Sequence, residues 1–243
     1  MLNEFSRSAL LFGEDGMEKL KNARVAVFGV GGVGGYVVEA LARSGVGTLD
    51  IIDNDTVALT NINRQIIATQ KTVGRYKVEV MKERILDINP KAVVNAHQCF
   101  FMPDNAADFP FDQYDYVVDA IDTVTAKIEL VMQAQKAGTK IICSMGAGNK
   151  MNPAMFEVAD VYKTSVCPLA KVMRKELKAR GVKKLKVVYS KEPAMKPEEN
   201  LANNCKVECP SRRSVPGSNA FVPATAGLII ASEVVKDIIG YEE

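Results

Sequence analysis

Glycines and one acidic residue near the start of the chain have the types and spacing for binding a phosphorylated ligand. Gly29, Gly31 and Gly34, with Gly32 between them, fit the pattern G-x-G-x-x-G. Without a β-carbon the backbone bends sharply and approaches a phosphate closely. Asp53 follows about 19 residues after the last glycine, where an acidic residue usually binds ribose hydroxyls. The pattern predicts a nucleotide site, and a glycine-rich turn without a ligand is the alternative.

A second polar cluster separates ATP from NAD as the expected ligand. Residues 60–65 read Thr-Asn-Ile-Asn-Arg-Gln, and Lys77 follows. Arg64 and Lys77 are two cations suited to a triphosphate, because positive charge stabilises the pyrophosphate that leaves. An NAD-dependent redox enzyme or NAD-binding regulator accounts for the glycines and Asp53 but leaves residues 60–65 without a role. Two ordinary surface cations are a further alternative.

Asp122 completes the predicted chemistry. It follows the strand-like run at 115–119, and side chains at the carboxyl end of a parallel strand face the ligand crevice. Magnesium prefers oxygen ligands and is often bound by one or two carboxylates together with substrate phosphates. The sequence therefore predicts that Asp122 holds Mg²⁺ opposite the two cations.

The elements that must position these residues alternate between strand and helix. Such an order predicts an α/β, Rossmann-like, doubly wound and mostly parallel sheet with helices on both faces. The long helix at 74–88 stops before Pro90, as helices do. The expected elements are strands at 24–28, 48–53, 93–100, 115–119 and 140–144, helices at 33–44, 74–88 and 124–137, an irregular active-site segment at 54–70, and a polar linker to 113.

The second half is less regular, and we expect the whole chain, 1–243, to form one domain. An N-terminal helical arm, 1–22, with a helix at about 14–21 precedes the sheet. Prolines and few apolar residues at about 191–219 predict a mobile crossover loop, since long loops without elements are often functional. The remaining expected elements are a strand or strand pair at 153–161, helices at 168–180 and 223–239, and a strand at 186–190.

Composition narrows the class of protein. The chain has 243 residues, of which 47% are hydrophobic and 25% charged, so it can bury a substantial core and is not disordered. Its first residues lack the apolar core of a signal peptide, and no stretch reaches the roughly 18 apolar residues of a membrane span. The best candidate, 220–231, is better interpreted as a core helix. We predict a cytoplasmic protein with no membrane partner.

The cysteines do not form a recognisable metal site. The five are an odd number without a secretory context, so reduced thiols are expected. Cys205 and Cys209 are separated by three residues with no second pair, and a tetrahedral zinc site needs four ligands. We therefore expect no zinc. Cys143, Cys167, Cys205 and Cys209 are candidate nucleophiles, but each is expected to be a small buried apolar group or a bystander. Cys167, beside Pro168, is the least implausible nucleophile of the four.

Charge is distributed unevenly along the chain. The net charge is +2, but residues 163–191 hold ten Lys or Arg and only one acidic residue, Glu176. A one-sided basic surface is typical of contacts with a nucleic-acid backbone, and a solvated helix face is the alternative. The candidate nucleic-acid contacts are Lys171, Arg174, Lys175, Lys178, Lys183 and Lys184.

These motifs together resemble a known superfamily. The pattern GxGGVG…D…D…TNxNRQ…K…DAxD is similar to that of the E1-like (ThiF/MoeB/ubiquitin-activating) adenylating enzymes. Later segments resemble their tRNA threonylcarbamoyladenosine dehydratase branch. The likeness covers about residues 5–238. The supporting segments are 40–47, 74–79, 88–90, 163–164, 168–169 and 216–227.

The resemblance implies roles for individual residues. Gly31 and its neighbours would cradle phosphate, and Asp53 would bind ribose. Asp122 would hold Mg²⁺, and Arg7 would enter the ATP site of the neighbouring subunit of a homodimer; a solvated arginine is the alternative. The remaining ATP-site residues are Asn61, Arg64 and Lys77 on the phosphates, with Gln65 and Asp55 adjacent.

The resemblance also implies an activity. ATP would adenylate the carboxylate of N6-threonylcarbamoyladenosine at position 37 of tRNA, and cyclisation would follow with loss of water. The alternative is an adenylyltransferase that activates the C-terminal glycine of a ThiS- or MoaD-like sulfur carrier, which uses the same ATP residues. The absence of paired Cys-x-x-Cys motifs and the basic segment favour tRNA. A monovalent cation and a cysteine-desulfurase sulfur-acceptor partner remain open.

Overall fold

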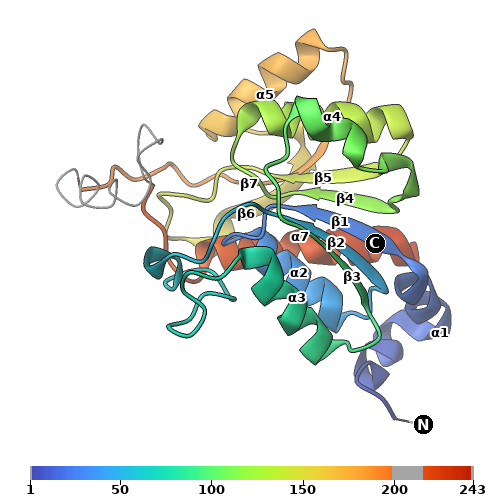
Figure 1. Cartoon of the computed structure of the whole chain (residues 1–243). Helices are drawn as coiled ribbons and strands as arrows, with labels where there is room; N and C mark the ends of the chain where they lie inside the picture. Colours follow the sequence, from blue (N-terminus) through green and yellow to red (C-terminus); the bar gives the residue numbers. More distant parts are fainter. Residues whose placement is uncertain (1, 199–215, 242–243) are drawn as a thin grey trace.

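A single seven-stranded sheet forms the centre of the molecule (Figure 1). The computed structural model describes residues 2–198 and 216–241. The strand order is β3-β2-β1-β4-β5-β7-β6, and only the edge strand β6 runs antiparallel to its neighbour. The predicted mostly parallel, doubly wound sheet is thus confirmed. The strands are β1 (Arg24–Phe28), β2 (Thr48–Ile52), β3 (Val93–His97), β4 (Tyr116–Asp119), β5 (Lys140–Ser144), β6 (Phe156–Asp160) and β7 (Lys186–Ser190).

The sheet reverses its direction of growth at β1. The chain builds β2 and β3 on one side of β1 and then returns to place β4 on the other side. Phe28, the last residue of β1, lies between Ile52 of β2 and Asp119 of β4. A crevice opens at the carboxyl ends of strands where the order reverses, and this is where open α/β sheets bind ligands. The glycine turn follows β1 directly, so it lies at this crevice.

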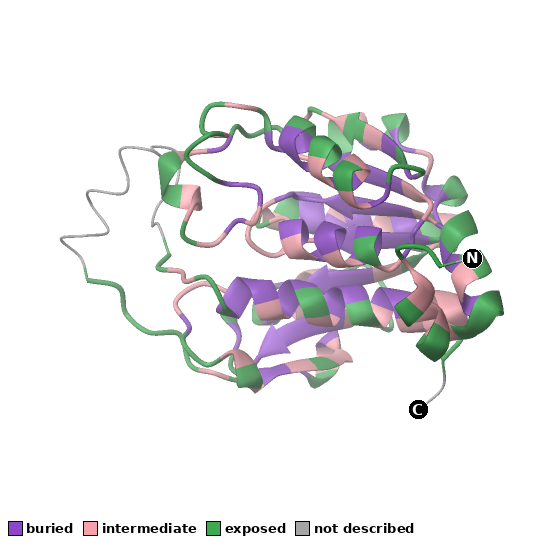
Figure 2. Cartoon of the chain, turned by 90° about the horizontal axis from the view of Figure 1, so that it is seen from below, coloured by how far each residue is buried: buried purple, intermediate pink, exposed green. Residues whose placement is uncertain are grey.

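Two layers of helices cover the sheet (Figure 1). One face carries α1 (Ser6–Asn22), α2 (Gly34–Arg43), α3 (Lys77–Ile88) and α7 (Val222–Ile239), and the other carries α4 (Val124–Ala137) and α5 (Pro168–Ala179). Figure 2 shows the buried residues concentrated in the strands and on the inner sides of the helices. This layering is what the alternating order of elements requires.

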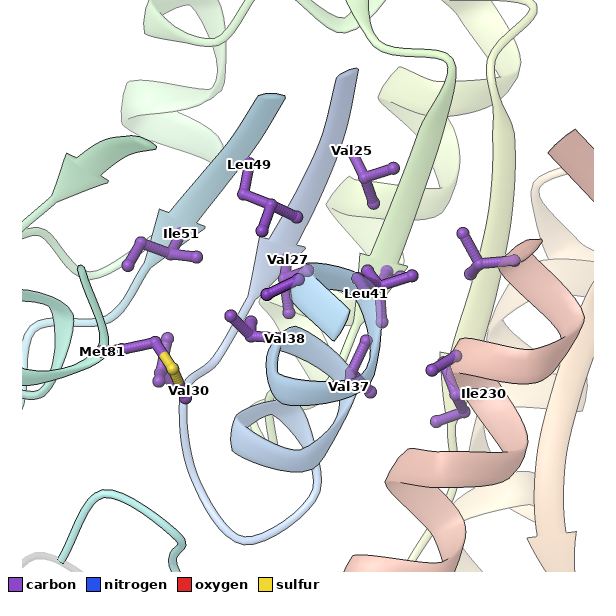
Figure 3. Packing of buried hydrophobic residues seen from close by; sticks show 14 of the residues in the cluster. Val25, Val27, Val30, Val37, Val38, Leu41, Leu49, Ile51, Met81 and Ile230 are labelled. Carbon is purple, nitrogen blue, oxygen red and sulfur yellow. The ribbon is translucent and has the colours of Figure 1, made fainter. Parts of the chain in front are cut away.

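The larger core lies between the sheet and α2, and Figure 3 shows its central contacts. Val27 of β1 packs with Val37 and Leu41 of α2, and Ile230 of α7 closes the side of this group. The apolar spacing of residues 33–44 predicts that Val37, Val38, Leu41 and Ala42 form the inner face of α2, and all four are buried. Residues 220–231, the most apolar stretch, lie mainly in α7 and contribute to this core. Within the described residues, no helix combines the length and the hydropathy needed to cross a bilayer.

Some boundaries differ from those predicted. Helix α1 begins at Ser6 rather than near Glu14, and it continues through a kink at Gly13, whose φ of +69° suits glycine. The linker after β3 contains two short 3-10 helices, η2 (Pro103–Asp108) and η3 (Phe111–Gln113). The apolar spacing of residues 168–180 predicts that Val172 lies on the inner face of α5, but Val172 is 43% exposed. Most of the expected crossover loop, 199–215, lies outside the described residues.

Candidate active site

Two glycines of the turn after β1 are required by close backbone contacts. Gly29 has a φ of +92°, and a β-carbon there would lie 2.7 Å from the carbonyl oxygen of Ala120. A β-carbon on Gly34, the first residue of α2, would lie 1.7 Å from the carbonyl oxygen of Gly29. No side chain fits in either place. The backbone between them can therefore form a tight cradle whose amides precede the N-terminus of α2, a site that favours phosphate.

Asp53 connects this cradle to Lys77. One oxygen of the Asp53 carboxylate accepts the Val30 N–H at 2.8 Å, and the other accepts the Asp55 N–H at 2.9 Å. The Lys77 ammonium lies 3.6 Å from Asp53 Oδ1 and 2.7 Å from Asp55 Oδ2. Lys77 is the first residue of α3 and is only 5% exposed. Its charge is thus held beside the cradle by two carboxylates from the segment that follows β2.

Arg64 also lies against the cradle. Its Cγ atom is 3.4 Å from the position that a β-carbon on Gly32 would occupy. The guanidinium donates to the carbonyl oxygen of Thr60 at 2.9 Å and to Asn63 Oδ1 at 2.8 Å. Asn61 fixes the start of this segment, because its side-chain oxygen accepts the Ala58 N–H at 3.1 Å. The side chain of Arg64 therefore lies over the turn that the sequence assigns to phosphate.

Gln65 contributes a buried polar group beside Gly31. Gln65 is 6% exposed, and its Nε2 atom is 3.9 Å from the position of a β-carbon on Gly31. Its Oε1 atom is buried and has no hydrogen-bond partner within the described parts of the chain. Buried acceptors without a donor are costly, so such a group suits a site where a ligand supplies the donor.

Asp122 is exposed and lies between the end of β4 and the start of α4. It belongs to segment 120–123, whose Ala120 contacts the positions of β-carbons on both Gly29 and Gly34. The carboxylate therefore lies in the segment that closes the back of the glycine turn. Its oxygen donors are of the kind that Mg²⁺ prefers when phosphate oxygens complete the coordination.

The sequence analysis missed an ion pair below segment 120–123. Asp119 and Lys127 are both fully buried, and Lys127 Nζ lies 2.8 Å from Asp119 Oδ2. Lys127 shares a face of α4 with Val131 and Ala134, both fully buried. This spacing places Lys127 on the buried face of the helix, and it is the sequence feature from which a buried lysine could have been predicted.

A second missed feature is the contact between the C-terminal part of the chain and the site. Asn63 donates to the carbonyl oxygen of Ser218 at 3.0 Å, and Pro223 lies 3.3 Å from the position of a β-carbon on Gly32. Asn149, with a φ of +58°, exchanges hydrogen bonds with Gly217 through its backbone N–H and its side chain. These contacts fix the entry to α7 next to Arg64. They join segments far apart in the sequence, so no local pattern indicates them.

The predicted basic residues are mostly on the surface of α5 and the turn after it. Lys171, Lys175 and Lys178 are exposed and share one face of the helix, because they are spaced by four and three residues. Lys183 and Lys184 are also exposed. Arg174 is half-buried and donates to the carbonyl oxygen and hydroxyl of Thr164. Arg174 therefore fixes the segment before its own helix rather than standing free for a ligand.

Arg7 is exposed and is not brought to the glycine turn of its own chain. Phe5 lies 3.5 Å from the position of a β-carbon on Gly45, which follows the C-terminal end of α2. Gly34 is at the other end of that helix. Figure 1 shows the start of α1 at the opposite end of the molecule from the carboxyl ends of the central strands.

Neither Cys99 nor Cys143 is activated as a nucleophile. Cys143 is fully buried, and burial together with the charge of Asp119 raises its pKa well above the usual value. Burial and Asp108 raise the pKa of Cys99. Cys167 is buried at the start of α5, while Cys205 and Cys209 lie outside the described residues. Over residues 2–198 and 216–241, no three His, Cys, Asp or Glu side chains form a group that could hold a metal ion.

Comparisons with known proteins identify the family of this chain. The model of the ThiF family matches residues 5–243. A tRNA threonylcarbamoyladenosine dehydratase of Bacillus subtilis is 44% identical, with 98% of this chain and 96% of that protein covered. Crystal structures of the Escherichia coli tRNA N6-threonylcarbamoyladenosine dehydratase TcdA, in complex with AMP and with ATP, match with TM-scores of 0.88 and 0.86. Their identities are 35% and 34%, and each covers 98% of this chain and 94% of the E. coli chain. This chain therefore belongs to the ThiF family, in its tRNA threonylcarbamoyladenosine dehydratase branch.

Proposed function

We propose that this chain uses ATP to convert N6-threonylcarbamoyladenosine at position 37 of tRNA to its cyclic, dehydrated form. The observation that carries the proposal is the connection from Lys77 through Asp53 to the Val30 amide, with Arg64 lying over Gly32. Two cations beside one glycine turn suit a triphosphate better than a dinucleotide. The B. subtilis and E. coli relatives, named for this activity, support the choice of substrate.

Each side chain then has a task in binding ATP. The amides of the glycine cradle receive phosphate at the start of α2, and Asp53 binds the ribose hydroxyls. Arg64 and Lys77 neutralise the phosphates, with Asn61 fixing the segment that carries Arg64. Gln65, whose Oε1 atom lacks a donor, accepts one from the nucleotide.

Magnesium fits the donor set at Asp122. This carboxylate is exposed and lies in the segment that contacts the glycine turn. Mg²⁺ usually takes one or two protein carboxylates and completes its shell with phosphate oxygens and water, so one aspartate is sufficient. When bound, the ion would neutralise charge on the phosphates and orient them.

The reaction has two steps. A carboxylate oxygen of the threonyl group attacks the α-phosphorus, the bond from that phosphorus to the bridging oxygen breaks, and pyrophosphate leaves with the electron pair. The ureido nitrogen or oxygen of the same modification then attacks the activated carbonyl carbon, and AMP leaves as the nucleophile loses its proton. The second step is intramolecular, so proximity alone accelerates it strongly, and no cysteine is required.

We also propose that two copies form a dimer in which Arg7 reaches the partner's nucleotide. Leu10 and Leu11 are each 84% exposed on α1, and their spacing of three and four residues from Arg7 places all three on one face. An exposed apolar face of this kind marks an interaction surface. An arginine on the same face, remote from its own glycine turn, suits a site shared between two copies.

The basic face of α5, formed by Lys171, Lys175 and Lys178, is the proposed contact for the tRNA backbone. Figure 1 shows α5 on the outer surface of the α4 side of the sheet. Lysines that neutralise phosphates give affinity without reading sequence, so this face would orient many tRNAs alike.

Nucleoside mass spectrometry tests the activity. The purified chain is incubated with Mg²⁺, ATP and tRNA that carries N6-threonylcarbamoyladenosine. The nucleoside is expected to lose the mass of one water while AMP and pyrophosphate form in equal amounts. The same tRNA without the modification is the control and should give no AMP. Pyrophosphate exchange that required a ThiS- or MoaD-like carrier and ignored tRNA would replace this proposal with the sulfur-carrier alternative.

A further inference from the structure

Two opposite charges lie wholly inside the protein beneath the candidate active site. Asp119 is the last residue of β4, and Lys127 lies in the first turns of α4. Both side chains have 0% exposure, and Lys127 Nζ lies 2.8 Å from Asp119 Oδ2. Charged side chains are almost never fully buried unless they are paired, so this location needs an explanation.

The contacts of Lys127 connect three parts of the chain. Besides the ion pair, its ammonium donates to the carbonyl oxygen of Ile121 at 3.2 Å and to that of Ser144 at 2.8 Å. The ammonium thus makes two hydrogen bonds to backbone carbonyls and a charge contact with Asp119. The end of β4, the segment after it and the end of β5 are therefore held by one side chain.

Asp119 holds the same segment from its other side. Its Oδ1 atom accepts the Ile121 N–H at 3.3 Å, so Ile121 is bound through both its N–H and its carbonyl. Ala120 and Asp122 flank Ile121. Ala120 closes the back of the glycine turn at Gly29 and Gly34, and Asp122 is the proposed magnesium residue.

Stability alone does not account for this pair. Burying two charges costs desolvation that their attraction only partly returns, and well-packed apolar replacements of a buried pair are often neutral or stabilising. A second ion pair, between Arg24 and the fully buried Asp50, lies at the start of β1, and its Arg24 side chain is 26% exposed. Asp50 is as buried as Asp119, but Arg24 begins the strand and is remote from the glycine turn. Both pairs join an acidic and a basic side chain, but only Asp119 and Lys127 contact the segment beside the glycine turn.

We infer that Asp119 and Lys127 are positioning residues that fix segment 120–123, so that Ala120 shapes the glycine turn and Asp122 faces the phosphates. The inference rests on the proposed ATP site. Neither residue touches the nucleotide. They act by keeping the backbone of the segment in one place before ATP arrives, and preorganised groups of this kind bind more tightly than mobile ones.

The test compares Asp119→Asn/Lys127→Met with the matched control Arg24→Met/Asp50→Asn. Hydrogen exchange is measured first, in the nucleotide-free protein. The amides of 121–123 are expected to exchange at least tenfold faster in the first variant and at an unchanged rate in the control. Calorimetry then gives the Kd of ATP with and without Mg²⁺. We expect the first variant to lose at least tenfold in affinity with Mg²⁺ and clearly less without it, while the control stays within twofold.

Two results of these measurements would overturn the inference. A folded variant whose 121–123 amides exchange at the original rate overturns the inference, as does faster exchange with an unchanged Kd for ATP with Mg²⁺. If the double variant does not fold, Lys127→Arg replaces it, because a guanidinium keeps the charge but cannot reproduce the three contacts of an ammonium. If the unaltered chain binds no ATP, the proposed function fails, and the exchange measurement alone decides whether the pair holds the segment.

Discussion

Lys77 Nζ lies 3.6 Å from Asp53 Oδ1, and the other oxygen of the same carboxylate accepts the N–H of Val30. One acidic side chain thus connects a lysine at the start of α3 to the glycine turn after β1. Asp55 shares the ammonium at 2.7 Å. The consequence is that the charge of Lys77 is fixed in place before any nucleotide binds, so the catalytic role that we propose for it would require little reorganisation.

Replacement of Lys77 by methionine is expected to lower the rate of ATP–pyrophosphate exchange by about 100-fold or more, because a positioned cation at developing charge is worth that much. Exchange of radiolabelled pyrophosphate measures it. Lys82 lies on the same helix and is exposed, so Lys82→Met is the matched control and should retain the original rate. Equal rates in the two variants would remove Lys77 from the site.

A methyl group on Gly34 is expected to disrupt the turn. The added carbon would lie 1.7 Å from the carbonyl oxygen of Gly29, and a backbone atom cannot move away cheaply. Gly34→Ala should therefore lower the melting temperature and abolish ATP binding. Gly35→Ala is the stability control: its nearest neighbour would be Ile66 Cγ2 at 3.4 Å, an ordinary contact, and alanine is favoured in helices by up to about 1 kcal/mol. Differential scanning calorimetry measures the melting temperatures of both variants. Equal melting temperatures would contradict the steric argument.

The sequence predicts much of this fold because the decisive signals are local. The strand at 24–28, the glycines after it and the helix at 33–44 lie within one continuous stretch, and the structure confirms both elements. Patterns of this kind report which face of an element is buried. Helix ends were less accurate: the start of α1 was missed because Gly13 interrupts a helix that continues on both sides of it.

Interactions between distant segments were not predictable in the same way. The Asp119–Lys127 pair depends on α4 lying against β4 and β5, and the hydrogen bond from Asn63 to Ser218 joins residues 155 apart. Arg174 appeared to be one more surface cation, and only its contact with Thr164 distinguishes it from Lys171 and Lys175. Periodicity gives a side chain its face but not its partner.

Charge reversal on the basic face of α5 is expected to weaken tRNA binding and leave ATP binding intact. Lys171→Glu/Lys175→Glu/Lys178→Glu removes three cations that share one surface. If each meets a phosphate, the slope of log K against log salt should become shallower by about 2 to 3, and affinity at low salt should fall at least about tenfold. Fluorescence anisotropy at several salt concentrations measures both. Lys71→Glu/Lys82→Glu/Lys91→Glu changes three exposed lysines elsewhere and is the matched control. An equal loss in both triple variants would indicate a general charge effect and no specific face.

Low pH is expected to lower the free energy of unfolding, partly because Asp50 becomes protonated. Burial alone would raise the pKa of this carboxyl, but hydrogen bonds from Arg24, His97 and Asn95 outweigh it and lower the pKa to about 2 from 3.8. A depressed pKa stabilises the folded state above pH 4 and ceases to do so as pH falls toward 2, and a shift of this size corresponds to about 2 kcal/mol. Urea unfolding at pH 5 and pH 3 should show the advantage of the unaltered chain over Asp50→Asn shrinking by about 1 kcal/mol. A difference that stays constant would mean that Asp50 is not held as a stabilised carboxylate.

Complementation between two inactive variants tests whether Arg7 completes the partner's site. Arg7→Ala and Lys77→Met are each expected to be nearly inactive as homodimers. In a mixed dimer, the chain that carries Arg7→Ala keeps its own Lys77 and receives Arg7 from the other copy, so one of the two sites is complete. Random mixing makes half of the dimers mixed, and activity should return to about a quarter of the original value.

The mixture is unfolded and refolded together and then assayed for AMP. Arg7→Ala mixed with itself is the control. If the mixture shows no more activity than the variants alone, Arg7 does not act between subunits, and the exposed face of α1 with Leu10 and Leu11 needs another partner.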